Sequence, residues 1–330
     1  MENTIAVIGG GSWATALVKI VSKEHHKVWW WMRDEDSVAH IKEKGFNPNY
    51  LRDVKINLDV VTPTTNLKKA IRHANNIVIA TPSAFIENTF AELSAEDFKQ
   101  KKIISGVKGM LPNLHVSVTE WLCNHFQFPE EDIAFIAGPC HAEEVALKKQ
   151  SYLTIAATNL DTAAHFAELL HRRFIKTTPL QDLHGAEYAA VMKNIVSLAC
   201  GITHGLNYGD NFQAVMVANA MQEIKRFIDA IDPRPRDICA SAYLGDLLVT
   251  AYSPLSRNRT FGNYIARNYT PSKIQMEMNM VAEGYYAVKS IYEINQKHGV
   301  DMPITSAAYR ILYEDKNAKL EMKDLEGRLV

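Results

Sequence analysis

The first half of the chain alternates short apolar runs with helical stretches. The runs are rich in β-branched and other apolar side chains, which is typical of the buried strands of a parallel sheet. We predict strands over 5–8, 27–32, 60–62, 76–81, 102–107, 133–137, 153–157 and 174–178. Helical segments such as 67–74 lie between them. This alternation predicts an α/β fold built on a largely parallel, doubly wound sheet.

The pattern changes near Thr178 and Pro179, beyond which strand signals are nearly absent. Helices are predicted over 184–205, 212–231, 237–252 and 271–298, with a shorter one from Pro303. The buried face of the second is expected to carry Val215, Ala218, Met221, Ile224 and Ile228, which recur at helical spacing. The charged tail, 317–330, is expected to be poorly ordered. The chain therefore divides into an α/β domain, residues 1–179, and an all-α domain, residues 180–330.

Composition excludes several classes of protein. At 330 residues the chain exceeds one typical domain, and its 36 basic and 37 acidic side chains leave a net charge of −1. No broad basic surface follows, so a nucleic-acid partner is not expected. No apolar run reaches membrane-spanning length and no signal sequence precedes the first strand, so we expect a cytoplasmic protein without an integral membrane segment. The four cysteines are far apart, which predicts reduced thiols and no metal site.

The first strand runs directly into a glycine-rich turn, in the sequence TIAVIGGGSWATAL. Gly9, Gly11 and Ala14 have the G-x-G-x-x-A spacing of a dinucleotide-binding turn. The first glycine permits the tight turn, the second lets the backbone approach a pyrophosphate, and the alanine lets the helix pack against the strand. The helix from Ser12 would direct free N–H groups at the phosphates. A plain structural connector is the alternative, but the strand before and the helix after favour nucleotide binding.

The residues after the second strand bear on the choice of cofactor. In NAD-selective folds an acidic residue often follows this strand and bonds the ribose hydroxyls. Here Arg33 comes first, and it could stack on adenine or meet a 2′-phosphate, whereas Asp34 could serve NAD. A solvated loop is the third reading. The sequence leaves NAD and NADP both open.

Lys193 is the strongest candidate for acid–base chemistry. Its helical neighbours at three and four positions are Ala189, Ala190, Val196 and Ser197, none of which is acidic. A lysine on such a face would be partly desolvated, which lowers its pKa toward neutrality and suits a general base or acid. Asn194 alongside is a neutral hydrogen-bonding group, and Glu187 could orient the lysine from the same helix. The alternative is a lysine whose ammonium reaches water at the helix edge.

Three other polar groups and one cysteine are further candidates for chemistry. Asp246 lies within YLGDLLVTA, where a carboxylate is costly unless it is paired, either with a catalytic lysine or in a structural ion pair. Ser256-Arg257-Asn258-Arg259, expected in a loop after Pro254, would suit a phosphate clamp, although arginine-containing loops are often solvated surface. Lys108 follows a strand at the expected cofactor edge. Cys140 lacks an orienting group beyond the adjacent His141, so it is not expected to act as a nucleophile.

Seven short motifs together carry a family resemblance. They are GGGSWATAL near the amino terminus, VKG at 107–109, GP at 138–139, AVMKN at 190–194, GDL at 245–247, SRNRTFG at 256–262 and VAEG at 281–284. In this order, over nearly the whole chain, they resemble NAD(P)-dependent glycerol-3-phosphate dehydrogenase. The resemblance implies a Rossmann-like domain followed by an all-α substrate-binding domain. It also implies hydride transfer between sn-glycerol 3-phosphate and dihydroxyacetone phosphate, usually to supply phospholipid synthesis.

The resemblance also implies roles for individual residues. Lys193 matches the proton acceptor, and Asp246 would hold it and bond the substrate hydroxyl. Cofactor contacts are expected, besides Gly9 and Gly11, from Ser12, Trp13, Arg33, Lys108, Ala142, Arg257, Val281 and Glu283. Substrate contacts are expected from Lys108, Gly138, Lys193, Asn194, Asp246, Ser256, Arg257 and Asn258. Cys140 stands where the family usually has Ser or Thr, and a thiol is a weaker donor, so its substrate contact is expected to be diminished.

Rival functions remain on this sequence alone. A β-hydroxyacid dehydrogenase shares the sheet-then-helices layout but would need a carboxylate-binding site. A non-catalytic protein that senses NAD(P)H would bind cofactor without turnover. The expected partner is a small phosphorylated triose with NAD or NADP, no metal is required, and a homodimer is the candidate assembly.

Overall fold

The computed structural model describes residues 3–278 and 282–330, which form two compact units. The first unit comprises the chain up to Val107 together with Val118–Leu183, and the second comprises Lys108–Ser117 and His184–Val330. This division differs from a cut after residue 179 in one respect that bears on function. A short segment, 108–117, is inserted in the sequence of the first unit and packs as part of the second.

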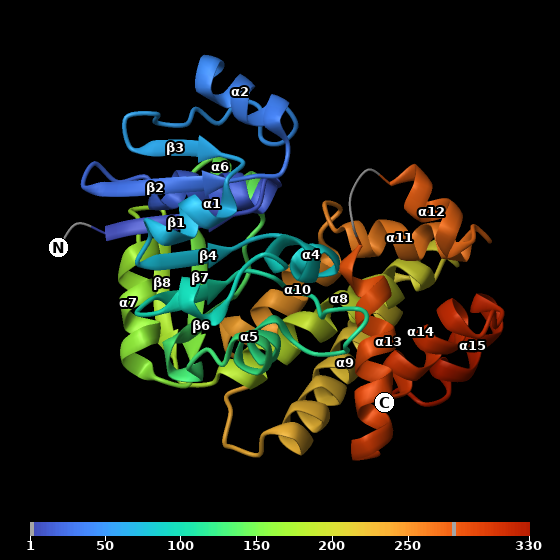
Figure 1. The fold of residues 1–330 in the computed structure, drawn as a ribbon. Helices are drawn as coiled ribbons and strands as arrows, with labels where there is room; N and C mark the ends of the chain where they lie inside the picture. Colours follow the sequence, from blue (N-terminus) through green and yellow to red (C-terminus); the bar gives the residue numbers. More distant parts are fainter. Residues whose placement is uncertain (1–2, 279–281) are drawn as a thin grey trace. The chain divides into compact units, whose positions relative to one another are not determined.

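The first unit is built on a single eight-stranded sheet (Figure 1) in the order β3-β2-β1-β4-β5-β6-β7-β8. The strands are β1 Asn3–Ile8, β2 His26–Trp31, β3 Val61–Thr64, β4 Asn76–Ile79, β5 Lys102–Ser105, β6 Ile133–Ala137, β7 Ser151–Ala157 and β8 Ile175–Leu180. All neighbours pair in parallel except β6 and β7. The predicted Rossmann-like α/β fold is confirmed, with one antiparallel pair added at the β6–β7 junction.

Helices and short 3₁₀ turns connect these strands. The α-helices are α1 Ser12–Val21, α2 Glu35–Lys44, α3 Leu67–Arg72, α4 Ile86–Phe90, α5 Val118–Phe126, α6 Ala142–Ala146 and α7 Leu160–Leu170. The 3₁₀ turns are η1 Ser83–Phe85, η2 Ala95–Phe98 and η3 Glu130–Asp132. Central strands such as β4 and β6 are buried along their whole length, because helices cover both faces of a parallel sheet.

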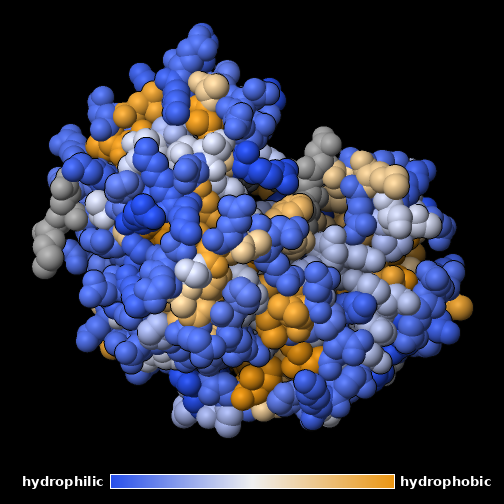
Figure 2. Space-filling view, viewed as in Figure 1, coloured by the Kyte–Doolittle hydropathy of each residue, from blue (hydrophilic) through white to orange (hydrophobic). Residues whose placement is uncertain are grey.

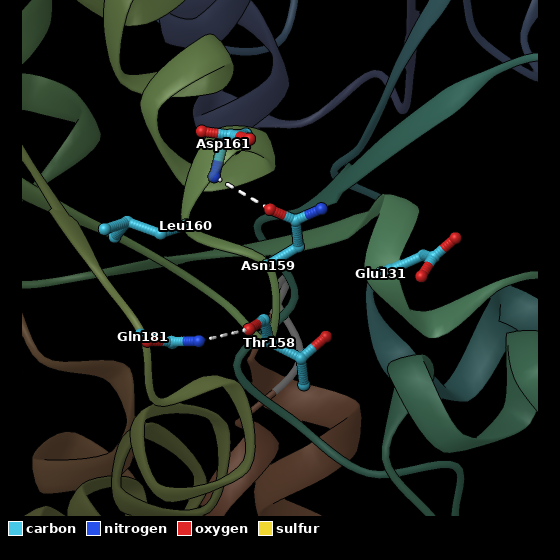
Figure 3. A pocket seen from close by; sticks show the side chains of 6 residues that line it. All are labelled: Glu131, Thr158, Asn159, Leu160, Asp161 and Gln181. Carbon is cyan, nitrogen blue, oxygen red and sulfur yellow. Dashed lines mark hydrogen bonds between the residues drawn. The ribbon is translucent and has the colours of Figure 1, made fainter.

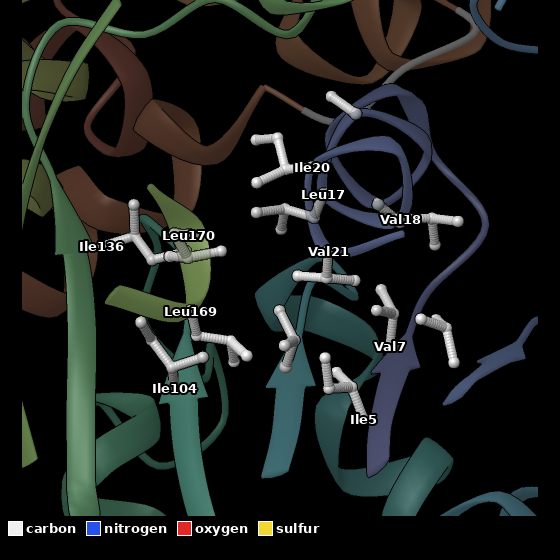
Figure 4. Packing of buried hydrophobic residues seen from close by; sticks show 14 of the residues in the cluster. Ile5, Val7, Leu17, Val18, Ile20, Val21, Ile104, Ile136, Leu169 and Leu170 are labelled. Atoms are coloured by element: carbon white, nitrogen blue, oxygen red, sulfur yellow. The ribbon is translucent and has the colours of Figure 1, made fainter. Parts of the chain in front are cut away.

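The apolar core of this unit fixes the first strand and helix against each other. Ile5 and Val7 of β1 meet the side chains of Leu17 and Val21 on α1 (Figure 4), and all four are fully buried. Leu170 of α7 and Ile136 of β6 extend the same cluster along the sheet. The turn that joins β1 to α1 is therefore held at both ends by packed elements.

In the part that the structure describes, the regular elements of the second unit are helices, whereas its segment 108–117 forms a loop with one isolated bridge between Leu111 and Val116. Its elements are α8 Leu183–Gly205, α9 Asp210–Ile231, the π-helical turn η4 Ser241–Gly245, α10 Asp246–Tyr252, α11 Arg257–Ala266, α12 Pro271–Glu277, α13 Glu283–His298, α14 Pro303–Tyr313 and α15 Ala318–Glu326. The all-α character predicted beyond Pro179 is thus seen from α8 onward. Leu183 opens α8 in sequence and is the last residue of the first unit.

The predicted long helix over 271–298 is wrong. Helix α12 ends at Glu277, Met278 has extended backbone, and α13 begins at Glu283. The tail also differs from expectation, because it forms α15. Asn317 caps this helix, and Met322 and Leu325 are buried beneath it. A cap and two apolar contacts order a segment whose charged composition predicted disorder.

The buried face of α9 is also shifted from the predicted one. Val215 is 40% exposed, and the inward positions include the polar residue Glu223. The Glu223 carboxylate accepts bonds from the backbone N–H groups of Ile304 and Thr305, at 2.8 and 2.9 Å, and from the Thr305 hydroxyl. Burial raises the pKa of Glu223, while these donors oppose the rise. Glu223 thus satisfies two backbone donors at the N-terminus of α14, which explains why this polar residue lies on the buried face of α9.

The face seen in Figure 2 is mostly hydrophilic, and its hydrophobic residues gather in a few patches. Within the described residues, no helix combines the length and apolar character that crossing a membrane requires.

Candidate functional site

The glycine-rich turn has the geometry that its spacing predicts. Gly9 has φ of +140°, and a Cβ there would lie 2.7 Å from the carbonyl oxygen of Ala80. Its own carbonyl accepts the indole N–H of Trp30 at 2.8 Å. Gly11 is the N-cap of α1 and lies beside open space, and no side chain caps the helix. The first turn of α1 therefore keeps backbone donors for an anionic ligand.

Asn47 holds this turn from a distant loop. Its amide nitrogen donates to the carbonyl of Gly10 at 3.0 Å and to the hydroxyl of Thr15 at 2.8 Å. Thr15 in turn donates to the carbonyl of Gly11 at 2.9 Å. Sequence reasoning missed Asn47, because its only sequence signal is an asparagine beside Pro48 in a loop. It orders the backbone that the glycines leave conformationally free.

The indole of Trp13 tests whether this turn fits a dinucleotide. Its Nε1 is buried and has no hydrogen-bond partner within the described chain. Gly106 makes room for it, since a Cβ at that position would lie 2.6 Å from Nε1. An unsatisfied buried donor is costly. Together with the uncapped helix and the space beside Gly11, this donor fits the phosphates or the amide of a nicotinamide dinucleotide.

Arg33 and Asp34 have different surroundings at the end of β2. The Asp34 carboxylate caps α2 by accepting the backbone N–H of Ser37 at 2.8 Å, and hydrogen bonding first to the Ser37 side chain and then to its backbone lowers the pKa of the exposed carboxyl. Arg33 is exposed, with its guanidinium carbon 6.0 Å from the centre of the Phe85 ring. Asp34 thus serves as the N-cap of α2, whereas the Arg33 side chain lies over the ring of Phe85.

The remaining sequence-predicted residues of the first unit follow β6. Gly138 has φ of +100°, and a Cβ there would lie 2.9 Å from the carbonyl oxygen of Tyr152, so only glycine fits. Cys140 is half-buried and packs against the hydrophobic core. None of the four cysteines forms a disulfide. Ala142 is the buried first residue of α6, as Ser12 is the first residue of α1.

The second unit contains a carboxylate shared by two lysines. Asp246 is the first residue of α10, and its side chain is 1% exposed. One carboxylate oxygen accepts the Lys193 ammonium of α8, and the other accepts the Lys108 ammonium at 2.9 Å. Lys193 is 6% exposed, so its ammonium does not reach water at the helix edge.

Burial sets the electrostatics of this cluster. Desolvation lowers the pKa of Lys193 to about 7, with Lys108 adding to the effect and Asp246 opposing it. Burial alone would raise the pKa of Asp246, but the two ammonium groups hold it below its ordinary value. The cluster therefore contains an amine that changes protonation near neutral pH beside a carboxylate that stays ionised.

Two asparagines extend the cluster toward α11 and α13. Asn194 donates to the backbone carbonyl of Lys108 at 2.7 Å, and its own oxygen accepts the amide of Asn258 at 3.0 Å. The oxygen of Asn258 accepts the backbone N–H of Gly284 at 2.9 Å. Of the sequence-predicted residues, five therefore meet in one bonded group, namely Lys108, Lys193, Asn194, Asp246 and Asn258. Gly284 was missed, although it stands in the VAEG motif.

The segment Ser256–Arg259 begins a helix, and the prediction of a loop is wrong. Ser256 is the N-cap of α11, and its hydroxyl lies 2.6 Å from that of Ser197 on α8. Glycines allow this close crossing of helices. A Cβ at Gly201 would lie 2.1 Å from the carbonyl oxygen of Arg259, and one at Gly262 would lie 2.0 Å from that of Leu198. The crossing sets Asn258 directly against Asn194.

The other predicted cofactor contacts of this unit lie at helix starts. Arg257 is the exposed first residue of α11, and Glu283 is the half-buried first residue of α13. Val281 lies outside the described residues.

A polar hollow of about 480 Å³ lies in the first unit, where β7 meets α7 (Figure 3). Its lining consists of Glu131, Thr158, Asn159, Leu160, Asp161 and Gln181. Asn159 caps α7 by accepting the Asp161 N–H, and Gln181 donates to the Thr158 carbonyl at 3.0 Å. None of the predicted site residues lines it.

Both units match known proteins. Residues 4–163 match the model described as NAD-dependent glycerol-3-phosphate dehydrogenase N-terminus, and residues 182–323 match the corresponding C-terminus. A glycerol-3-phosphate dehydrogenase [NAD(P)+] of Limosilactobacillus reuteri is 32% identical over 99% of this chain and 98% of its own. One from Clostridium botulinum is 35% identical over 97% and 96%. The crystal structure of the Coxiella burnetii glycerol-3-phosphate dehydrogenase has a TM-score of 0.88 at 27% identity, covering 98% of both chains.

Proposed function

The chain belongs to the family of NAD-dependent glycerol-3-phosphate dehydrogenases, and we propose that Lys193, Lys108 and Asp246 carry out the proton transfer of its reaction. It is an oxidoreductase that interconverts sn-glycerol 3-phosphate and dihydroxyacetone phosphate with NAD(P). This role is consistent with a supply of glycerol 3-phosphate for phospholipid synthesis. The observation that carries the proposal is the buried Lys193 amine, whose pKa is about 7, held on an ionised carboxylate.

In the oxidative direction neutral Lys193 takes the proton of the substrate C2 hydroxyl. In the reductive direction the ammonium returns it. The nicotinamide, when bound, supplies or accepts the hydride. Asp246 holds the amine in place, and it cannot take the proton itself because its pKa is held low. Lys108, on the second oxygen of Asp246, presents a positive charge that stabilises negative charge developing on the substrate oxygen.

The remaining site residues would hold the ligands. Arg257 is exposed at the start of α11, where its guanidinium would bind the substrate phosphate through paired N–H groups. Asn258 has one amide hydrogen bonded to Asn194 and a second available for the same phosphate. The turn formed by Gly9, Gly11, Ser12 and Trp13 would bind the cofactor pyrophosphate. The proposed substrate contacts of Gly138 and Cys140, and the cofactor contacts of Ala142 and Glu283, rest on family resemblance.

The direct test is oxidation of NADH and NADPH with three acceptors in parallel. We expect turnover with dihydroxyacetone phosphate and none with a 3-oxo acid such as malonate semialdehyde. Removal of the phosphate, in dihydroxyacetone, should lower kcat/KM by at least about 10²-fold, because the paired guanidinium–phosphate hydrogen bonds are lost. Turnover with the 3-oxo acid alone would favour a β-hydroxyacid dehydrogenase, and cofactor binding without any turnover would favour a sensor.

We expect Arg33 to contribute more to the binding of NADPH than to the binding of NADH. The 2′-phosphate adds a charge of about −1.5 to −2, and the exposed guanidinium stands beside the residue that would otherwise contact the ribose. In an Arg33→Ala variant, KM for NADPH should rise about 10-fold or more, with KM for NADH changing by about 2-fold at most. Asp34→Ala is the matched control, and it should destabilise α2 without this selectivity. Equal changes for both cofactors would remove Arg33 from phosphate recognition.

Three further predictions from the sequence remain proposals. A homodimer and the lack of a nucleic-acid partner are compatible with the near-zero net charge, and a cytoplasmic location is compatible with four cysteines that form no disulfide.

A further inference from the structure

The two bonded asparagines of the second unit belong to a chain of hydrogen bonds in which every donor points the same way. The Gly284 N–H donates to Asn258, Asn258 donates to Asn194, and Asn194 donates to the Lys108 carbonyl, at 2.9, 3.0 and 2.7 Å. Both asparagines are more than nine-tenths buried. Each side-chain oxygen accepts a bond along the chain and each side-chain nitrogen donates one, so reversing either amide would break two bonds.

This chain of hydrogen bonds begins at the start of a helix and ends at the lysine pair. At one end, Gly284 is in the first turn of α13, whose N-cap residue Ala282 provides no side-chain bond. Asn258 of α11 therefore satisfies a helix donor that a cap would otherwise satisfy. At this residue only glycine fits, since a Cβ would lie 2.6 Å from the Asn194 carbonyl oxygen and 3.0 Å from Asn258 Oδ1. At the other end, the carbonyl belongs to Lys108, whose ammonium shares Asp246 with Lys193.

We propose that Asn258 is a positioning residue, which holds the Lys108 backbone through Asn194 and so keeps both lysines on the one carboxylate of Asp246. This inference rests on the proposed function, in which Lys193 transfers the proton. It assigns Asn258 a task besides contact with substrate phosphate. These buried bonds tie Lys108 to the starts of α11 and α13, and the segment 108–117 also bonds α13 further along, where His115 Nδ1 lies 3.0 Å from the Ser290 hydroxyl.

The consequence is a specific change in proton affinity. The charged groups that act on the Lys193 ammonium are Asp246 of α10 and Lys108. If Lys108 leaves Asp246, Lys193 loses a repelling neighbour and gains the undivided carboxylate, and both changes favour its protonated form. The group would then lose its proton at higher pH, and oxidation of glycerol 3-phosphate would need more alkaline conditions.

The test is the pH dependence of kcat for oxidation, at saturating substrate and cofactor, in Asn258→Ala. We expect the ascending limb to move upward by about one pH unit. Asn258→Leu, which fills the volume without bonding, should show the same shift and covers a failure of the alanine variant to fold. Asn219→Ala is the control, because Asn219 is a similarly buried amide of α9 that bonds the backbone of Val215 and Val330. It should leave the limb in place.

The outcomes distinguish the positioning role of Asn258 from the role of Lys193 as the base. A limb near pH 7 in the unsubstituted enzyme that stays unmoved in both Asn258 variants, even with a raised KM for glycerol 3-phosphate, would overturn the positioning role and leave Lys193 as the base. A limb that also moves in Asn219→Ala would overturn it too, since loss of any buried amide would then suffice. Absence of a limb near pH 7 in the unsubstituted enzyme would count against the proposed function itself.

Discussion

A Lys193→Met enzyme should lose about 10³ to 10⁴-fold in kcat in both directions, the upper range for removal of a general acid–base group. Methionine keeps an unbranched apolar stem on α8, so the packing of the helix is retained. Asp246 keeps Lys108 as a partner at 2.9 Å, and no uncompensated charge is left in the interior. The loss should therefore appear in turnover, with the dissociation constant for NADPH, measured by fluorescence titration, within about 2-fold of the original.

Lys225→Met is the matched control for this substitution. Lys225 is an exposed lysine of α9 that pairs with Asp229 in the same unit. Its loss should leave kcat unchanged, since surface ion pairs contribute little. Turnover within about 10-fold of normal in Lys193→Met would show that another group transfers the proton.

A Gly262→Ala enzyme should be strongly destabilised. The added Cβ would lie 2.0 Å from the carbonyl oxygen of Leu198, an atom of the α8 backbone that has no rotamer to change. The helices must separate, and overpacking of this kind costs about 3 kcal/mol or more in unfolding free energy. For a unit of this size the melting temperature should fall by roughly 6 °C or more. Separation would also pull Asn258 from Asn194, so kcat should fall in the fraction that folds.

Gly209→Ala provides the control for added bulk at a glycine. Gly209 is the N-cap of α9, has ordinary backbone angles, and has open space where the Cβ would be. Its melting temperature should change by about 2 °C at most, because Gly at an N-cap is exchanged for Ala at modest cost. Equal melting temperatures for Gly262→Ala and Gly209→Ala would contradict the close crossing of α8 and α11.

Local patterns predicted most of the fold. Strands β1 and β2 and the turn at Gly9 follow from short-range rules, because β-branched runs and glycine spacing act within a few residues. Misjudged boundaries lay where a distant residue decided the outcome. The start of α13 at Glu283 is one example, because Asn258 of another helix satisfies a backbone donor in its first turn. The buried Glu223 is another, since its partners follow it by more than seventy residues.

The site was predictable in its residue types and less so in its bonds. A lysine without acidic helical neighbours pointed to Lys193, and an isolated carboxylate in apolar sequence pointed to Asp246. Their pairing is a tertiary fact that spacing does not determine. The sharing of Asp246 with Lys108 depends on the segment 108–117 packing with the second unit, and nothing in its local sequence indicates that.

The central claim is that burial keeps Lys193 near its point of half-protonation. Its most direct test is kcat for glycerol 3-phosphate oxidation from about pH 5 to about pH 10, with the reverse reaction measured alongside. Burial lowers the pKa of this amine to about 7, so oxidation should rise with pH through about 7 and level off, while reduction should fall over the same range. Two flat profiles through this range, or an oxidative limb only near the ordinary lysine value of about 10.4, would contradict the account.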